Sequence, residues 1–303
     1  MRALVIGYGS IGKRHVRVLR DLGFAVAVVS AQDDVPELSY SDVGSALVDF
    51  SPDYVVICNA THLHFDTMDE LAIGGFQGNV LVEKPLFCAV SSVPKNKFAN
   101  IYVGYNLRFH PIFSRLKSLL SDAQVLSTNV YVGQYLPDWR PGTDYRESYS
   151  AKKEEGGGVL RDLSHEIDYL IWLLGAWKSI TAHGGSVSSL EIATEDVYTI
   201  LMSTKRCPIV LVQMSYLDRV KRRRMIINTE KNCLEIDLVN NFILINDEKE
   251  VFDVSADTTY SEMHLAVLHN DRRRLCSVEE STDILELIEV VEHCNGTYWK
   301  YNE

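Results

Sequence analysis

The first hundred residues alternate short apolar runs with stretches in which apolar residues recur at helical spacing. The apolar runs are rich in β-branched residues and are bounded by Gly, Asp, Asn or Ser; they cover residues 3–6, 25–29, 54–58, 80–82 and 101–104. Runs of this kind suit strands buried on both faces of a parallel sheet. The helical spacing is found between them, in residues 11–22, 42–50 and 63–73. This alternation predicts right-handed βαβ units in a doubly wound sheet.

The pattern changes after about residue 120, where partial apolar/polar alternation replaces the continuous runs. Such alternation, interrupted by turn-like pairs, indicates an antiparallel sheet with one covered face; it covers residues 124–132, 198–203, 209–216, 223–228, 233–238 and 242–245. One long helix is predicted from the residue after Gly158 to Gly175, and a final helix over 283–293. We therefore expect a doubly wound α/β domain over residues 1–106. An α+β domain with an open, mainly antiparallel sheet follows over 107–303, and its last helix can pack back toward the first domain.

Composition places the chain among ordinary globular proteins. Its 303 residues are 46% hydrophobic and 23% charged, which is enough apolar material for two cores. The formal net charge of −11 opposes a nucleic acid as partner, because such binding needs clustered Lys and Arg. The six cysteines lack the paired spacing of zinc sites, so no metal is expected. Without a long apolar stretch or a signal-peptide core, we expect a soluble, cytoplasmic protein that does not bind membranes.

A glycine-rich turn follows the first predicted strand and opens the first predicted helix. Its sequence, Gly7-Tyr8-Gly9-Ser10-Ile11-Gly12, fits the pattern G-x-G-x-x-G. In that pattern the first glycine permits a tight turn, the second lets the backbone approach a pyrophosphate, and the third allows close packing of helix on strand. The helix N-terminus adds unsatisfied N–H groups and a partial positive charge. We interpret residues 7–12 as a dinucleotide-binding turn.

The end of the second predicted strand bears on the choice between NAD and NADP. A carboxylate there binds the ribose 2′-hydroxyl of NAD, whereas a neutral or basic end admits the phosphate of NADP. Here the strand ends in Val29-Ser30-Ala31-Gln32, and Ser30 could donate to a phosphate. However, no Arg follows, and Asp33 and Asp34 would repel a phosphate. The cofactor is therefore NADP or NAD, with a slight preference for NADP.

Polar residues follow three consecutive strands of the predicted parallel sheet. They are Asn59 and His64 after the run 54–58, Glu83-Lys84-Pro85 after 80–82, and Asn106 and Arg108 after 101–104. In open α/β sheets, ligands bind in the crevice at the carboxyl ends of the strands. We expect these side chains to converge on one rim. Asn59, His64, Glu83 and Lys84 are assigned to cofactor binding together with Ser30 and the glycine turn, and Asn106 and Arg108 to substrate binding.

Taken in order, these motifs resemble the glucose–fructose oxidoreductase and inositol dehydrogenase family (Gfo/Idh/MocA). The resemblance runs nearly end to end, through the glycine turn, residues 59–64, Glu83-Lys84-Pro85, Gly104-Tyr105-Asn106, and residues 156–162 followed by His165 and Asp168. It implies a Rossmann domain joined to an open antiparallel sheet whose broad face commonly forms oligomer contacts, so we expect a homodimer or homotetramer. It also implies hydride transfer between nicotinamide and a sugar or cyclitol carbon, with Lys84 as the motif lysine and Asp162 and His165 completing the site.

The chemistry of alcohol oxidation explains why these residue types occur together. The reaction needs a hydride acceptor on one face of the carbon and a proton acceptor at its hydroxyl. His165 could be that base, because imidazole titrates near a pKa of about 6.5. The Lys84 ammonium favours negative charge developing on the same oxygen. Asp162 could orient the imidazole or hold a neighbouring substrate hydroxyl, so these three residues are assigned to catalysis.

The spacing between Asp162 and His165 departs from the family. It is three residues here and usually four, which turns the histidine around a regular helix by about 100°. Either the helix begins irregularly after the glycines, or His165 is not the base and Lys84 carries more of the proton chemistry. In the family, a version resembling Asp162-Leu163-Ser164-His165-Glu166 occurs in a branch linked to surface-polysaccharide sugars.

A loop rich in aromatic and basic residues lies between the two predicted domains. Aromatic rings stack on sugar faces, and arginines grip phosphates or carboxylates; the residues assigned to substrate binding here are Trp139, Arg140, Tyr145 and Arg146. The loop is either a substrate lid or an oligomer arm. It is followed by Tyr149 and Lys153, which match the Tyr-x-x-x-Lys pair of short-chain dehydrogenases. We reject that match, because Gly156-Gly157-Gly158 would weaken the helix that the pair requires.

Two functions are compatible with these features. The first is an NAD(P)-dependent sugar dehydrogenase or reductase, acting on a small sugar or nucleotide sugar in surface-polysaccharide or amino-sugar metabolism. The second is a regulatory protein of the same fold that binds NAD(P) without turnover. The presence of Lys84, Asp162 and His165 favours the enzyme, whereas the altered helical spacing favours the regulator.

Overall fold

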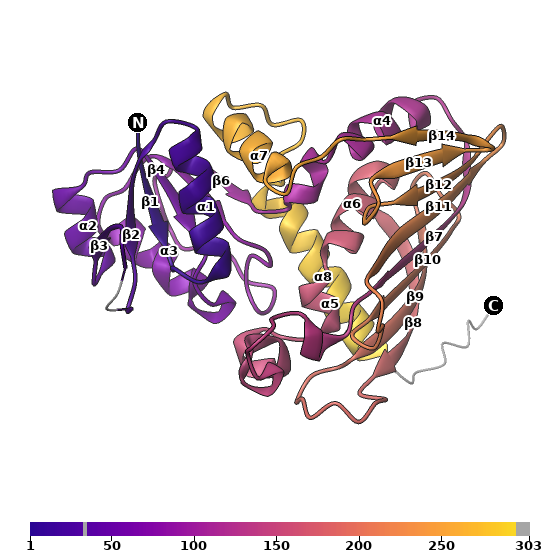
Figure 1. The fold of residues 1–303 in the computed structure, drawn as a ribbon, viewed down its shortest axis with the longest axis horizontal. Helices are drawn as coiled ribbons and strands as arrows, with labels where there is room; N and C mark the ends of the chain where they lie inside the picture. Colours follow the sequence, from indigo (N-terminus) through magenta and orange to yellow (C-terminus); the bar gives the residue numbers. More distant parts are fainter. Residues whose placement is uncertain (33–34, 295–303) are drawn as a thin grey trace. The chain divides into compact units, whose positions relative to one another are not determined.

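The computed structural model describes residues 1–32 and 35–294, which form two compact units. The first unit comprises Met1–His110 and Ser255–Leu285, and the second comprises Pro111–Val254 and the residues from Glu286 onward. Each unit is described by itself below. Figure 1 shows a helix-flanked sheet in the first unit and a broad sheet in the second.

The first unit is built on a parallel sheet. In the described part of the chain it has six strands in the order β3-β2-β1-β4-β5-β6, and every pairing between neighbours is parallel. The strands are β1 (Arg2–Ile6), β2 (Ala25–Val29), β3 (Leu38–Tyr40), β4 (Tyr54–Ile57), β5 (Asn79–Val82) and β6 (Asn100–Val103). The strand order reverses between β1 and β4, and this switch point is where doubly wound sheets bind their ligands.

Helices complete the first unit. They are α1 (Ser10–Asp21), α2 (Val43–Asp49), α3 (His64–Ile73) and α7 (Thr258–Leu268), with short 3₁₀ turns at Thr61–Leu63 and Asn106–Phe109. The central strands β1 and β4 are buried along nearly their whole length, as the continuous apolar runs predict. The predicted doubly wound sheet is therefore confirmed.

The domain boundaries differ from the prediction at one place that matters for function. The first unit extends to His110 and also includes Ser255–Leu285, which the sequence placed in the second domain. The reason is packing: Tyr260, Met263 and Val267 on one face of α7 lie in the same buried cluster as Val16 of α1 and Tyr54 of β4. The order of elements along the chain does not predict this long-range contact.

The second unit holds a mixed sheet. Within the described residues its eight strands run in the order β14-β13-β12-β11-β7-β10-β9-β8, antiparallel except for the β7–β10 pair. The strands are β7 (Val125–Gly133), β8 (Trp177–Gly185), β9 (Val197–Thr204), β10 (Ile209–Ser215), β11 (Arg222–Thr229), β12 (Cys233–Asp237), β13 (Phe242–Ile245) and β14 (Glu248–Val251). This confirms the predicted α+β fold with an open, mainly antiparallel sheet.

The long helix predicted after Gly158 is two helices. They are α5 (Val159–Asp162) and α6 (His165–Leu174). At the break, the amides of Ser164 and Glu166 bond to carbonyls three residues back instead of four. Gly158 has φ +117°, and an added Cβ would collide with the Glu195 carboxylate, which accepts a hydrogen bond from the Leu160 amide. The helix thus begins irregularly, as one of the two explanations for the Asp162–His165 spacing expected, and the role of His165 as the base stays a prediction.

The last helix also begins earlier than predicted. It is α8 (Val278–Cys294), and the structure divides it between the two units at Leu285. Ser277 and Glu280 form a capping box before it: the Glu280 amide donates to Ser277 Oγ, and the Ser277 amide donates to Glu280 Oε2. The helix α4 (Pro111–Leu120) and 3₁₀ turns at Leu136–Asp138, Tyr145–Glu147, Tyr149–Ala151 and Lys153–Glu155 complete the second unit.

Candidate functional site

The glycine turn joins β1 to α1 with the geometry that a dinucleotide requires. Gly7 has φ +99°, and a Cβ there would lie 2.6 Å from the Asn59 backbone nitrogen. A Cβ on Gly12 would collide with the carbonyl of Gly7. At Gly9, by contrast, no atom of the described residues lies within 4 Å of an added Cβ. The first and third glycines are therefore needed for packing, whereas the second leaves open space in front of the N-terminus of α1.

The N-terminus of α1 offers unsatisfied backbone donors to that open space. Gly9 is the N-cap residue and has no side chain to cap the helix, and its carbonyl already accepts the amide of Lys13. The first amides of an α-helix have no partner within the helix, and the helix dipole favours an anion there. The turn thus fits a pyrophosphate, with Ser10 and Ile11 at the first positions of the helix.

Tyr8 and Ser30 flank the turn on the side of β2. The Tyr8 hydroxyl donates to Glu37 at 3.1 Å, and Glu37 also pairs with Arg20. Ser30 Oγ accepts the amide of Gln32 at 3.1 Å. Asp33 and Asp34 lie outside the described residues. The sequence analysis missed Glu37, which brings a carboxylate to the glycine turn from seven residues beyond Ser30.

The rim residues after β4 fix the neighbouring loop. Asn59 Nδ2 donates to Thr67 on α3 at 2.8 Å, and Asn59 Oδ1 is buried without a hydrogen-bond partner among residues 1–32 and 35–294. The ring nitrogens of His64 lie 3.0 Å from the Leu86 carbonyl and 3.2 Å from the Asn59 carbonyl. His64 is 1% exposed, and burial lowers its pKa. His64 therefore ties two loops together, and its assignment to cofactor binding stays a prediction that this burial does not support.

Glu83 and Lys84 follow β5 at the carboxyl edge of the sheet. Glu83 Oε1 lies 3.0 Å from Nε2 of His15, and Oε2 accepts the Lys84 amide at 3.3 Å. The Glu83 side chain is 12% exposed and supports the turn through these two contacts, and its assignment to cofactor binding stays a prediction. Lys84 is half-buried in the first unit.

Asn106 and Arg108, which follow β6, are buried. Asn106 Nδ2 donates to Thr259 Oγ1 of α7 at 2.7 Å. Arg108 is 2% exposed and pairs with Glu280 at 3.0 Å. A buried cation needs such a partner, because desolvation of an unpaired charge is costly. Both contacts hold residues 255–285 to the rest of the first unit, and the assignment of Asn106 and Arg108 to substrate binding stays a prediction.

In the second unit, Asp162 is the centre of a buried polar cluster. It lies at the end of α5, and its Oδ2 accepts the Tyr216 hydroxyl at 2.6 Å. The Tyr149 hydroxyl is also hydrogen-bonded to Asp162, and burial followed by the Asp162 charge raises the pKa of both phenols. Both tyrosines therefore stay neutral and donate to the carboxylate. His165 follows at the start of α6.

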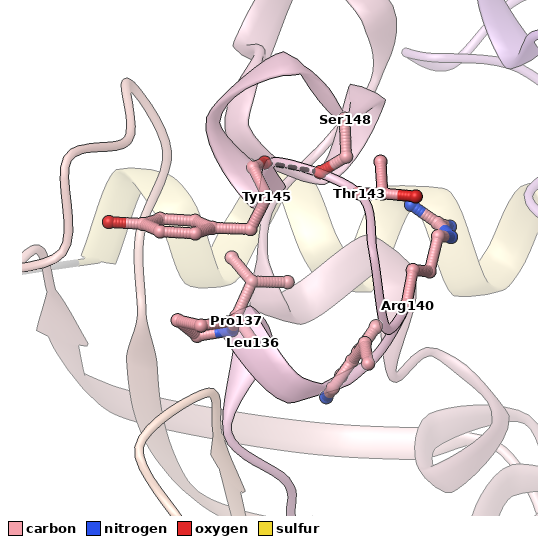
Figure 2. A pocket seen from close by; sticks show the side chains of 7 residues that line it. Leu136, Pro137, Arg140, Thr143, Tyr145 and Ser148 are labelled. Atoms are coloured by element: carbon pink, nitrogen blue, oxygen red, sulfur yellow. Dashed lines mark hydrogen bonds between the residues drawn. The ribbon is translucent and has the colours of Figure 1, made fainter.

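The aromatic loop contributes two predicted residues to this cluster. The Trp139 ring meets the Tyr216 ring edge-on, with centroids 5.2 Å apart, and the Arg140 guanidinium lies 5.1 Å from the centroid of Tyr149. Trp139 and Arg140 also line a small pocket, together with Leu136, Pro137, Thr143, Tyr145 and Ser148 (Figure 2). The structure thus brings Trp139 and Arg140 together with Asp162 through two tyrosines.

Arg146 does not join the cluster. Its guanidinium pairs with Asp144 and with Glu191, each at 2.7 Å, on the exposed side of the loop. The backbone amide of Glu191 donates to the Tyr145 hydroxyl at 3.3 Å, so these contacts close the loop on itself. Arg146 is satisfied by two carboxylates, and its assignment to an anionic substrate is not supported by this geometry.

Tyr149 and Tyr216 were missed as site residues. Tyr149 was noticed only within a motif of another enzyme class, and its three-residue 3₁₀ turn shows why that motif does not apply. Tyr216 directly follows β10, and a polar residue at a strand end was the available signal. Lys84 belongs to the first unit and Asp162 and His165 to the second, so their meeting in one pocket stays a prediction.

Comparison with known proteins decides the family. A model described as "Oxidoreductase family, NAD-binding Rossmann fold" matches residues 1–97, and one described as "GFO/IDH/MocA C-terminal domain" matches residues 117–235. Together they match most of the chain. The chain belongs to the Gfo/Idh/MocA family. The resemblance seen in the sequence is confirmed, and the family is an NAD-binding one.

Individual relatives of this Gfo/Idh/MocA chain are distant. It is 26% identical over 171 residues to an uncharacterised oxidoreductase of Synechocystis (54% of this chain, 45% of that protein). It is 24% identical over 227 residues to inositol 2-dehydrogenase of Salmonella typhimurium (67% and 64%). The alignments thus span less than two thirds of these curated relatives. The WlbA dehydrogenase of Chromobacterium violaceum, solved with NADH and UDP-GlcNAcA, shares the fold with a TM-score of 0.79 at 19% identity (97% and 93% covered).

Two kinds of feature are absent from the part of the chain that the structure describes. No helix in residues 1–32 and 35–294 combines the length and apolarity needed to cross a membrane. The same residues contain no group of three or more His, Cys, Asp or Glu side chains that could hold a metal ion.

The open space at Gly9 leads to a prediction about cofactor binding. Gly9→Val should leave the thermal unfolding temperature within about 2 °C, because the residue has an ordinary extended φ of −74° and its Cβ meets no atom of the described residues. It should weaken NADH binding at least about 100-fold, since the side chain fills the space that the pyrophosphate needs. Fluorescence titration with NADH measures the affinity.

Gly12→Val is the matched control for this variant. Its Cβ would collide with the Gly7 carbonyl, so it should lower both the unfolding temperature and the affinity. Normal NADH affinity in a folded Gly9→Val protein would remove the glycine turn from the cofactor site.

Proposed function

We propose that this protein is an NAD(P)-dependent oxidoreductase that transfers hydride between nicotinamide and a secondary alcohol or ketone of a sugar. The observation that carries the proposal is the pairing, in one unit, of an open glycine turn with a lysine at the carboxyl edge of the same sheet. Family membership supports it, as do the names of relatives such as inositol 2-dehydrogenase.

The residues present fit a dinucleotide. The open face of Gly9 and the uncapped amides of α1 would hold the pyrophosphate, and Gly7 and Gly12 would keep α1 close to the sheet. The nicotinamide would supply the hydride acceptor or donor. The side chains of His64 and Glu83 would act behind this site by fixing the loops after β4 and β5.

Lys84 and His165 would carry the proton and charge chemistry. In oxidation the substrate hydroxyl loses its proton while its carbon loses hydride; in reduction both steps reverse. The imidazole of His165 would accept or return that proton, and the Lys84 ammonium would stabilise negative charge on the oxygen. Their approach to a shared substrate is part of the proposal.

Asp162 would hold its place in the site as an ionised carboxylate. The hydroxyls of Tyr149 and Tyr216 donate to it, and donors to the charged form stabilise that form. Its negative charge would stabilise the imidazolium that His165 becomes on taking a proton, or bind a hydroxyl next to the reacting carbon. The irregular turn between α5 and α6 accounts for the three-residue spacing, so the spacing no longer favours the regulator.

The substrate would be a sugar or nucleotide sugar in surface-polysaccharide or amino-sugar metabolism. Trp139 offers an aromatic face, and Arg140 lies beside Tyr149 within the Asp162 cluster, where a guanidinium could bind an anionic group. The complex of the WlbA dehydrogenase with UDP-GlcNAcA supports a nucleotide sugar for a chain of this fold. Incubating the protein with NAD or NADP and a panel of sugars, cyclitols and UDP-sugars tests the function. Cofactor binding without turnover of any panel member would favour the regulatory alternative.

Lys84→Ala should lower kcat about 100- to 10,000-fold on whichever panel member is oxidised, because a charge stabiliser and partner in proton transfer is lost. The affinity for NADH should change less than about fivefold, since the glycine turn is intact. Stopped-flow absorbance at the NADH band measures the rate. Lys95→Ala removes an exposed lysine of the same unit and is the control. An unchanged kcat in Lys84→Ala would exclude Lys84 from the mechanism.

The slight preference for NADP rests on Ser30 and stays a prediction. Glu37 acts against it, because its carboxylate is bonded to Tyr8 of the glycine turn. Glu37→Gln removes this charge and releases Arg20, so it should raise the affinity for NADPH relative to NADH about 3- to 10-fold. Parallel fluorescence titrations measure the ratio. Asp49→Asn, an exposed carboxylate on α2, is the control, and an equal change for both cofactors would place Glu37 away from the 2′-phosphate.

We also propose that the protein is a homodimer or homotetramer, assembled through the outer face of its mixed sheet. Leu201, Leu211 and Ile226 lie in one row across β9, β10, β7 and β11, with Asn129 of β7 between the last two. Leu201 is 50% exposed, and apolar rows on a sheet face commonly mark interfaces. Leu201→Asp should reduce the mass measured by sedimentation equilibrium to that of a monomer. An unchanged mass would assign the contact to another surface.

A further inference from the structure

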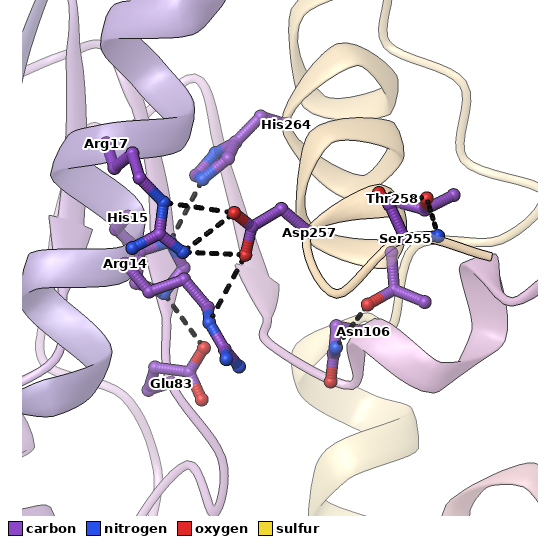
Figure 3. Close-up of polar contacts among 10 residues, drawn as sticks. Arg14, His15, Arg17, Glu83, Asn106, Ser255, Asp257, Thr258 and His264 are labelled. Carbon is purple, nitrogen blue, oxygen red and sulfur yellow. Dashed lines mark hydrogen bonds and ion pairs between the residues drawn. The ribbon is translucent and has the colours of Figure 1, made fainter. Parts of the chain in front are cut away.

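The first unit contains a continuous chain of four polar side chains, three of them buried and the fourth, Glu83, partly buried. The Tyr54 hydroxyl lies 2.9 Å from Nδ1 of His264, Nε2 of His264 lies 2.9 Å from Nδ1 of His15, and Nε2 of His15 lies 3.0 Å from Oε1 of Glu83. Both histidines are 0% exposed and Tyr54 is 1% exposed. The last three members are drawn in Figure 3, where the chain passes from α7 through α1 to the turn after β5.

With both imidazoles neutral, one arrangement of hydrogens satisfies every link to the Glu83 carboxylate. A carboxylate only accepts, so His15 must donate from Nε2, and a neutral His15 then accepts at Nδ1. His264 must therefore donate from Nε2 and accept at Nδ1 from the Tyr54 hydroxyl. In this arrangement all donors point toward Glu83. A second proton on His15, at Nδ1, would require His264 to carry its own proton on Nδ1 and to donate it to the Tyr54 oxygen.

The surroundings favour this neutral arrangement. Burial, followed by the charge that His15 would carry, lowers the pKa of His264 well below its ordinary value. Burial and the nearby Glu83 charge raise the pKa of Tyr54, so the phenol keeps its proton. The rings of Tyr260 and His15 meet edge-on with centroids 5.3 Å apart, and the Arg14 guanidinium lies 5.1 Å from the Tyr260 centroid.

The chain ends at the backbone of the motif lysine. While Oε1 of Glu83 accepts from His15, Oε2 accepts the amide of Lys84. The Glu83 carboxylate also packs closely against Gly104, because a Cβ on Gly104 would lie 2.9 Å from Glu83 Oε1. The Glu83 carboxylate is thus held between an imidazole, a glycine and the amide that precedes the Lys84 side chain.

Helix α7 brings His264 to this chain from a distant part of the sequence. Its start is fixed by Asp257, which accepts from Arg17 at 2.7 Å and pairs with Arg14 at 3.4 Å, both on α1. Thr259 in its first turn accepts from Asn106. These contacts also appear in Figure 3. The position of His264 is therefore set by residues 255–285, which follow the second unit in the chain.

We propose that His15 and His264 are positioning residues for hydride transfer: together they hold the Glu83 carboxylate in place, and Glu83 in turn holds the backbone of Lys84. The position of Lys84 consequently depends on α7. The role of Lys84 rests on the proposed function, whereas the chain of donors does not.

NMR of the full-length protein labelled with ¹⁵N-histidine and bound to NADH tests the donor chain directly. We expect both His15 and His264 to show a protonated Nε2 and an unprotonated Nδ1. Signals from a protonated imidazolium, or from the opposite tautomer at either position, would overturn the proposed arrangement. This measurement needs no substrate, so it remains decisive if no member of the sugar panel is turned over.

A pair of variants at position 15 tests the link to Lys84. His15→Leu removes the donor to Glu83, and should shift the backbone amide resonance of Lys84 and lower kcat about 10- to 100-fold, with KM for the cofactor changed less than threefold. His15→Gln can still donate to Glu83 from its amide nitrogen and should recover kcat to within about threefold of the wild type. A merely structural role predicts equal kcat in the two folded variants, and that result would overturn the proposal.

Two further variants test the same chain of contacts in case the variants at position 15 do not fold. Tyr54→Phe removes the outermost hydroxyl and His264→Gln removes the imidazole from α7, while both keep side chains of similar size. We expect the Lys84 amide resonance to move in His264→Gln and less in Tyr54→Phe, following distance along the chain. An unmoved resonance in His264→Gln would show that Lys84 does not depend on α7. If the wild-type protein turns over no sugar of the panel but the Lys84 amide resonance moves in the variants as expected, the proposed function is refuted and the positioning role is not.

Discussion

The carboxylate of Glu83 must be kept charged in a nearly closed space, and much of the first unit is arranged around that requirement. Moving a carboxylate out of water costs several kcal/mol unless donors replace the lost hydration. Here the donors are His15 on α1 and the Lys84 amide in the same turn. Because His15 then needs its own partner, the requirement passes to His264 on α7. A single buried charge therefore joins β5, α1 and α7.

The second unit meets the same requirement with different residues. Asp162 is 6% exposed, and its donors are the hydroxyls of Tyr149 and Tyr216. In both units a carboxylate accepts hydrogen bonds from side chains of the same unit. Such a charge favours protonation of a nearby base or ammonium. This property suits a reaction in which Lys84 and His165 must hold positive charge at defined stages.

The sequence predicted the features that depend on residues close together in the chain. The glycine turn, the placement of Lys84 after β5 and every strand of the described parallel sheet except β3 follow from local apolar runs and from G-x-G-x-x-G. The capping box of Ser277 and Glu280 is equally local and was missed, so α8 was predicted to start too late. Packing of α7 into the first core depends on side chains some 200 residues apart, and periodicity cannot report it.

The site assignments that the contacts of the structure do not support share one physical cause. His64, Glu83 and Arg108 are polar residues at the ends of strands, and the sequence analysis treated such residues as ligand-facing. Each is buried or partly buried and has protein partners, because a crevice that binds charged ligands needs loops of fixed geometry, and polar side chains fix them. Residue type and strand position identify the edge of the sheet, but they do not separate a side chain that touches the ligand from one that supports it. That separation requires knowing which donors and acceptors the protein already satisfies: by this criterion the open glycine turn remains available for binding, whereas Glu83 is already committed to the protein.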